Sequence, residues 1–116
     1  MASKKLALTA EMIDAVSARF RLLGEPARLR LLQQLEGGGE ATVNELATAV
    51  GSSQPNVSRH LNAMYEGGLL SRRRDGSNIY YSIGDPMVFE LCAIVCNSVR
   101  AKAQGRLKAL ARAARE

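Results

Sequence analysis

The sequence predicts a mainly helical fold with five helices and one small β-hairpin. Apolar residues recur at helical spacing along most of the chain. Two short helical stretches are separated by a few residues that include Gly51, and this is the spacing of a helix-turn-helix. The pair Asp75-Gly76, which is favoured in tight turns, lies between two short segments of extended character. This order of elements predicts a winged helix-turn-helix, with four helices followed by a hairpin and a final helix.

The first two helices have clear start signals. Thr9 can cap the first helix, and Pro26 suits the first turn of the second. The first helix carries an apolar face formed by Met12, Ile13, Val16 and Phe20. In the second helix we expect Leu29, Leu32 and Leu35 to face the core. We expect Arg28 and Arg30 to stay in water. The run Gly37–Gly39 ends this helix.

Residues 43–66 form the predicted helix-turn-helix. Thr42 opens its first helix, and Glu45 three residues later completes a possible capping box. Gly51 ends that helix, and either Ser52 or Ser53 caps the next one. Two side chains of this second helix, Val57 and Leu61, should point back into the core.

The rest of the chain reads as a hairpin and one long helix. Residues 69–83 form the predicted wing, and residues 86–113 form the final helix. No linker long enough to divide the chain is found, so residues 1–116 are expected to form a single domain, with residues 1–8 flexible.

Composition limits the possible functions. The chain has 116 residues, 47% of them apolar and 23% charged, and a net charge of +5. Part of this charge is concentrated at Arg72–Arg74, which favours a nucleic-acid partner over a uniformly solvated surface. No apolar run approaches the length of a membrane span or a signal peptide. We therefore expect a cytoplasmic protein with no membrane partner, whose two cysteines are thiols.

Five segments in order resemble the arsenic-repressor (ArsR/SmtB) family of bacterial winged helix-turn-helix regulators. They are Leu23–Leu32, Glu45–Ala47, Ser53–Leu61, Glu66–Leu70, and Arg73–Gly76 followed by Ile79–Tyr81. The resemblance covers about residues 12–100. It implies a homodimer formed through the first and last helices. It also implies repression at double-stranded operator DNA, and release of that DNA when an inducer binds.

The second helix of a helix-turn-helix enters the major groove, where the residues near its N-terminus meet base edges. Amide side chains can pair with adenine and arginine with guanine, while serine can contact a base or a phosphate. The candidates on this helix are Ser53, Gln54, Asn56, Ser58, Arg59 and His60. His60 is the only histidine, and we expect it either to pack or to contact a phosphate. On the wing, the candidates for DNA contacts are Arg73, Arg74 and Asn78, and we expect the two arginines to contact phosphates or an adjacent minor groove. Strand alternation prevents Arg72–Arg74 from all facing the DNA.

Cys92 and Cys96 are the only cysteines, and they are placed four residues apart on the final helix. This spacing brings both thiols to one face of the helix, with Cβ atoms roughly 5–6 Å apart. Soft trivalent metalloids favour thiolates, so the pair predicts an inducer site for As(III) or Sb(III). No cofactor is expected for DNA binding itself. Zinc is disfavoured because no His or Asp completes a shell at helical spacing.

Other interpretations of the cysteines and of the whole chain remain open. The two thiols could sense redox or reactive-sulfur species, although an intact helix holds them too far apart for a simple disulfide. They could also be small packing residues, since both lie on the apolar stripe of the helix. An enzyme is disfavoured because the chain has no phosphate-binding loop, nucleophile elbow or second histidine. A winged helix used only for protein–protein contact is the remaining alternative.

Overall fold

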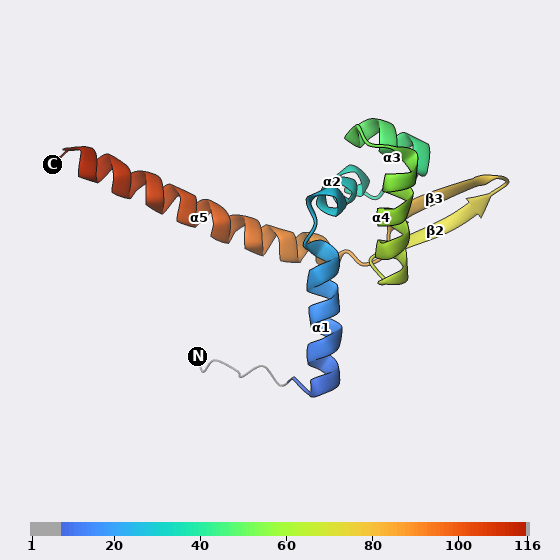
Figure 1. Cartoon of the computed structure of the whole chain (residues 1–116), viewed down its shortest axis with the longest axis horizontal. Coiled ribbons are helices and arrows are strands. Elements are labelled where there is room, and N and C mark those ends of the chain that lie inside the picture. The colour runs from blue at the N-terminus through green and yellow to red at the C-terminus, as the bar shows by residue number, and fades with distance from the viewer. Residues whose placement is uncertain (1–7, 116) are drawn as a thin grey trace. The chain divides into compact units, whose positions relative to one another are not determined.

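The computed structural model of the chain describes residues 8–115 (Figure 1). In order, the elements are α1 (Ala10–Leu23), α2 (Pro26–Leu35), β1 (Ala41–Thr42), α3 (Val43–Val50), α4 (Gln54–Glu66), β2 (Leu70–Asp75), β3 (Asn78–Ile83) and α5 (Met87–Arg115). The predicted winged helix-turn-helix is confirmed. The chain divides into two compact units, Met1–Gly84 and Asp85–Glu116. The single domain predicted for residues 1–116 stays a prediction. Of residues 1–8, which were predicted to be flexible, residues 1–7 lie outside the described part of the chain.

The predicted capping signals set the starts of three helices. The hydroxyl of Thr9 accepts a hydrogen bond from the backbone N–H of Met12. Thr42 and Glu45 form the full capping box at the start of α3, each side chain accepting from the other's backbone N–H. Ser53, rather than Ser52, caps α4. Each cap satisfies a donor that the first turn of a helix leaves unpaired.

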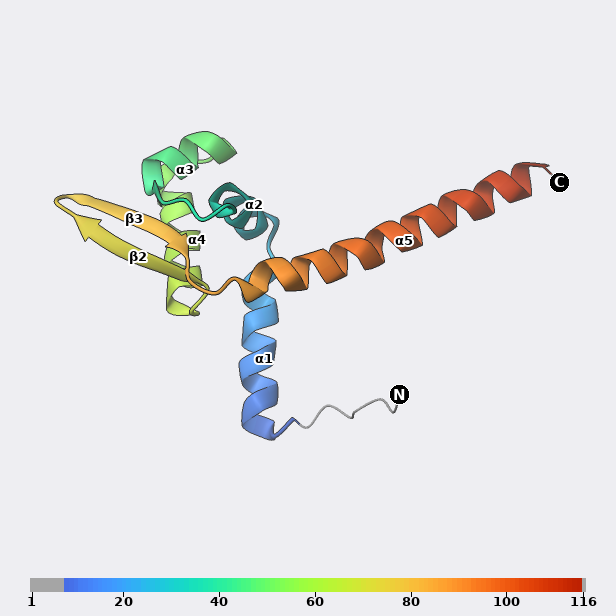
Figure 2. The same ribbon diagram turned by 180° about the vertical axis from the view of Figure 1, so that it is seen from behind.

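The three strands form one antiparallel sheet in the order β1-β3-β2. In the wing hairpin Asp75 pairs with Asn78, so the turn lies at Gly76 and Ser77, one residue later than the Asp75-Gly76 turn predicted from sequence. Gly76 has a φ of 64°, which a residue without a Cβ adopts at low cost. The hairpin extends beyond α4 to its tip, as both views show (Figures 1 and 2).

Strand β1 is absent from the sequence prediction. It contains two residues, Ala41 and Thr42, which pair with Tyr81 and Tyr80 of β3. Two residues are too few for an alternating pattern, so the strand exists only because β3 lies beside it. This pairing also places Glu40, directly before β1, next to the wing.

The core of the first unit is aliphatic, as its composition predicts. The side chains of Leu31, Leu32, Leu35, Leu46, Val57, Leu61, Met64 and Leu69 are at most 2% exposed. The predicted inward placement of Val57 and Leu61 is confirmed. Two expectations for α2 are wrong. Leu29 lies outside this buried face and is 42% exposed. Arg28 lies on the buried face, because it precedes Leu31 and Leu32 by three and four residues.

Large apolar side chains are exposed on both terminal helices. On α1 these are Met12, Ile13 and Phe20, and on α5 they are Ile94, Val95, Val99, Leu107 and Leu110. Rows of exposed apolar side chains of this kind mark surfaces that other proteins cover. Along residues 8–115 no helix combines the length and the apolar character needed to cross a membrane.

Candidate nucleic-acid interface

The outer surface of α4 is polar, and its inner surface is buried in the core. Gln54 and Arg59 are exposed, and Ser58 is half-buried, while Val57 and Leu61 on the other side are buried. Serine at the cap and proline in the first turn give α4 a fixed start. The helix therefore holds a short row of hydrogen-bonding side chains on a rigid support.

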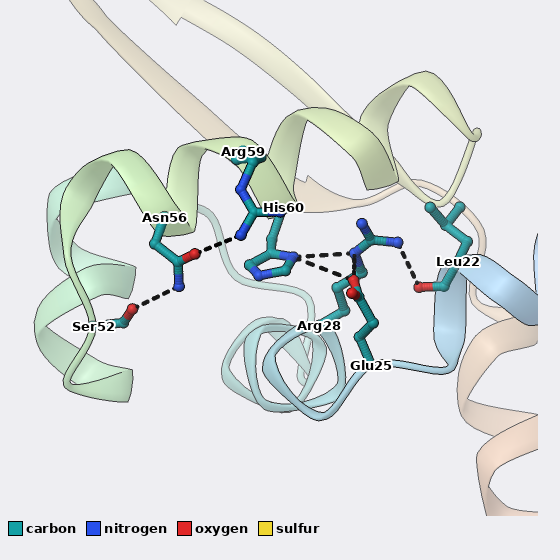
Figure 3. A network of polar contacts seen from close by, with 7 residues as sticks. All are labelled: Leu22, Glu25, Arg28, Ser52, Asn56, Arg59 and His60. Atoms are coloured by element: carbon teal, nitrogen blue, oxygen red, sulfur yellow. Dashed lines mark hydrogen bonds and ion pairs between the residues drawn. The ribbon is translucent and has the colours of Figure 1, made fainter.

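Two of the predicted base-reading residues are joined in a chain of hydrogen bonds (Figure 3). Asn56 donates from Nδ2 to the hydroxyl of Ser52 at 3.0 Å. Its Oδ1 accepts from a guanidinium nitrogen of Arg59 at 2.7 Å. The amide of Asn56 is therefore engaged at both ends, whereas Arg59 keeps donors for another partner. In this arrangement Asn56 orients Arg59, and its amide keeps a second N–H and a second lone pair for another partner.

His60 is buried in the structure, as the packing expectation has it, and its contact with a phosphate stays a prediction. The residue is 5% exposed and is the only buried polar or charged side chain among residues 8–115. Its Nδ1 accepts a hydrogen bond from Nε of Arg28 at 3.1 Å, and the carboxylate of Glu25 lies 3.6 Å from the same nitrogen (Figure 3). Burial lowers the pKa of His60, and the charges of Arg59 and Arg28 lower it further, against the opposing effect of Glu25. Burial and the two neighbouring cations thus favour the neutral imidazole.

Arg28 holds this network together and was not predicted as a functional residue. It pairs with Glu25 at 2.8 Å, and it donates to His60 and to the carbonyl of Leu22 at the end of α1. One side chain of α2 therefore joins the end of α1 to the middle of α4. The signal in the sequence was its place on the buried face of α2, which implies that a buried charge must find partners.

The three wing arginines have different surroundings. Arg72 lies over the ring of Tyr65, 3.9 Å from its centroid, and donates to Asn62 of α4. Arg73 pairs with the carboxylate of Glu40 at 2.7 Å and also lies over a tyrosine of β3. Strand alternation places Arg72 and Arg74 on one face of the hairpin and Arg73 on the other. Arg74 is exposed and makes no ion pair with any residue between 8 and 115. Asn78, which was also predicted to contact DNA, is exposed beside the hairpin turn.

Cys92 and Cys96 lie four residues apart on α5, where Cys92 is half-buried and Cys96 exposed. Within residues 8–115 no group of three or more His, Cys, Asp or Glu side chains is placed to hold a metal ion. Two thiols can thus come from one chain. A third ligand for a trivalent metalloid must come from a second chain, an external thiol or solvent.

The chain is similar in sequence to known helix-turn-helix proteins. Residues 23–73 match the family described as a helix-turn-helix domain. The chain is 45% identical over 78 residues to a probable mercury resistance operon repressor of Streptomyces lividans. The match covers 67% of this chain and 62% of that repressor, so the chain spans less than two thirds of its length.

Two solved structures are similar over most of the chain. One is a homodimeric winged helix-turn-helix DNA-binding domain of Mycobacterium bovis, described as a possible ArsR-family regulator. It is 33% identical with a TM-score of 0.70, over 86% of this chain and 91% of that one. The other is the AntR antimony-specific transcriptional repressor, 31% identical with a TM-score of 0.71, over 90% of this chain and 99% of that one.

Proposed function

The chain belongs to the ArsR/SmtB family of winged helix-turn-helix transcriptional regulators, and from this we propose that it represses transcription by binding double-stranded operator DNA as a homodimer. The family consists of regulators, so the chain is not an enzyme. One observation carries the proposal. The exposed side of α4 presents Gln54 and Arg59 near the start of the helix, where base edges are read.

The exposed apolar residues support the homodimer. Met12, Ile13 and Phe20 on α1 form an uncovered apolar surface, and α5 carries a second one. A second copy of the chain can cover such surfaces, and the similar M. bovis domain is homodimeric. A twofold dimer presents two copies of α4, and these fit half-sites about one helical turn of DNA apart.

We propose As(III) or Sb(III) as the inducer, bound by Cys92 and Cys96. Their spacing places two soft ligands on one helical face. The similar structure of an antimony-specific repressor supports a thiophilic inducer. A dimer supplies two such pairs. A ligand bound on the dimerisation helix can therefore change the distance between the two copies of α4 and release the DNA.

Fluorescence anisotropy with a labelled duplex from the protein's own promoter tests DNA binding. We expect this duplex to bind at least tenfold more tightly than a scrambled duplex of equal length. Binding should weaken steeply as salt rises, because contacts with phosphates release counterions. Equal binding of both duplexes would contradict a sequence-specific regulator. No binding of either duplex would favour the protein-interaction alternative.

Glu40 competes with DNA for Arg73 in this arrangement, so the Glu40→Gln variant should bind DNA more tightly. Both side chains are substantially exposed and 2.7 Å apart. Phosphate must displace the carboxylate before it can pair with Arg73. Because exposed ion pairs are weak, we expect only a two- to fivefold gain, roughly. The anisotropy titration measures it, and Glu36→Gln, which removes an exposed carboxylate from the end of α2, is the matched control. An equal gain in both variants would show that only net charge matters.

A further inference from the structure

A small cavity lies beside the N-terminal half of α4, within the first unit of the chain. Its volume is about 230 Å³, and α2, the α3–α4 turn and α4 contribute its walls. Four polar side chains line it, those of Arg30, Ser52, Asn56 and His60, and the other lining residues are apolar apart from Gly51. No acidic residue belongs to this lining. The cavity is therefore rich in donors and carries positive charge.

The hydrogen bond from Arg28 fixes which nitrogen of His60 carries the proton. A guanidinium can only donate, so Nδ1 of His60 is an acceptor and the neutral ring is protonated at Nε2. The ring's second nitrogen lies on the side away from Arg28 (Figure 3). Every buried polar side-chain atom of residues 8–115 has a partner. Among residues 8–115 none accepts a hydrogen bond from Nε2, and the His60 side chain lines the cavity. We infer that His60, a residue only 5% exposed, directs this N–H toward the cavity.

Arg30 and Ser52 add to this donor. Arg30 is exposed on α2, and it makes no ion pair with any residue in the part of the chain that the structure describes. The hydroxyl of Ser52 accepts from Asn56, which leaves its own proton for another acceptor. The carboxylate of Glu25 is on the Nδ1 side of the ring, where it pairs with Arg28. One cation and two neutral donors around a small cavity are suited to an oxyanion.

We propose that this cavity binds a phosphate of the DNA backbone, with Arg30 supplying the charge and with His60 Nε2 and the Ser52 hydroxyl donating hydrogen bonds. The proposal rests on DNA binding by α4. Asn56 lines the cavity and also holds Arg59, so the phosphate site and the base-reading residue share one support. Phosphate bound here would set the depth and orientation of α4 in the groove. Arg28 then acts as a positioning residue, since it fixes the tautomer of His60.

The Arg30→Gln variant tests the site in DNA binding. We expect it to weaken binding to the promoter duplex and to a scrambled duplex by the same factor, about 3- to 10-fold at moderate salt. The slope of log affinity against log salt should become less steep by about 0.9, which corresponds to one lost phosphate contact. Arg115→Gln removes one charge from the end of α5 and should leave the slope unchanged. An unchanged slope in Arg30→Gln would overturn the assignment to backbone phosphate.

Inorganic phosphate tests the cavity without DNA. His60 is the only histidine, so its ring signals in nitrogen-15 NMR are unambiguous. Above pH 7 we expect the Nε2-protonated form in the free protein, and a phosphate-dependent shift of Nε2 that Arg30→Gln removes. If the protein bound no duplex but showed this shift, the proposed function would be refuted and the oxyanion site would still stand. A shift combined with an unchanged DNA salt slope would assign the site to free oxyanions, and no shift at all would overturn it.

Discussion

Replacing Arg59 with alanine is expected to abolish discrimination between operator and scrambled DNA, while a weaker, salt-dependent affinity remains. Arg59 is exposed on α4 and its guanidinium is held by Asn56 at 2.7 Å. A well-placed arginine pairs with guanine through two hydrogen bonds, which contribute about 1–3 kcal/mol of discrimination. We therefore expect operator affinity to fall by a factor of about 5 to 150 per half-site. The side chain contributes nothing to the buried core, so the thermal midpoint should change little. Anisotropy titrations with both duplexes measure the loss.

Two further variants separate base reading from phosphate contact. Asn56→Ala removes the support of Arg59 without removing its charge, so it should cause a smaller loss of discrimination. Arg74→Ala removes an exposed wing cation and should weaken both duplexes equally. If Arg59→Ala also weakened both duplexes equally, Arg59 would contact phosphate and the base-reading role would be refuted.

A Cys92→Ser/Cys96→Ser double variant should stay bound to the operator at metalloid concentrations that release the wild-type protein. Serine is close to cysteine in size, but its hydroxyl is a hard, protonated ligand that soft metalloids bind poorly. The exposed thiol of Cys96 should bind first, and the half-buried thiol of Cys92 should complete the pair. The expected change is therefore a loss of response with no loss of DNA affinity. Titration of the protein–duplex complex with As(III) and Sb(III) in the anisotropy assay measures it.

The controls for this experiment distinguish the possible inducers. Hg(II) belongs in the same titration because the similar S. lividans protein is a probable mercury resistance repressor. Zn(II) should have little effect, and a persulfide donor tests the redox alternative. Sedimentation of the double variant checks that the dimer survives, since both cysteines lie on the helix with the exposed apolar row. Wild-type protein that keeps its DNA at saturating As(III) and Sb(III) would refute the metalloid proposal.

Features encoded by short stretches of sequence were predictable. The caps at Thr9 and Thr42, the proline at the start of α2 and the glycine turns fixed the helix boundaries to within a few residues. These signals act between neighbours in the chain, so their energetics do not depend on the rest of the fold. The inward placement of Val57 and Leu61 followed from helical periodicity in the same way. The candidate base-reading residues could be named because the helix that carries them was correctly located in the sequence.

Only the tertiary structure decided how the charged and polar side chains pair. The contacts between Arg28 and His60 and between Glu40 and Arg73 join residues 32 and 33 positions apart, and no local pattern encodes such contacts. For the same reason the predicted burial of Leu29 was wrong, because the side of α2 that is covered depends on where α3 and α4 pack. The sequence by itself therefore determined a winged helix-turn-helix with a polar reading helix and a pair of thiols. Long-range packing decided that His60 is buried beside Arg28 and that Glu40 pairs with a wing arginine.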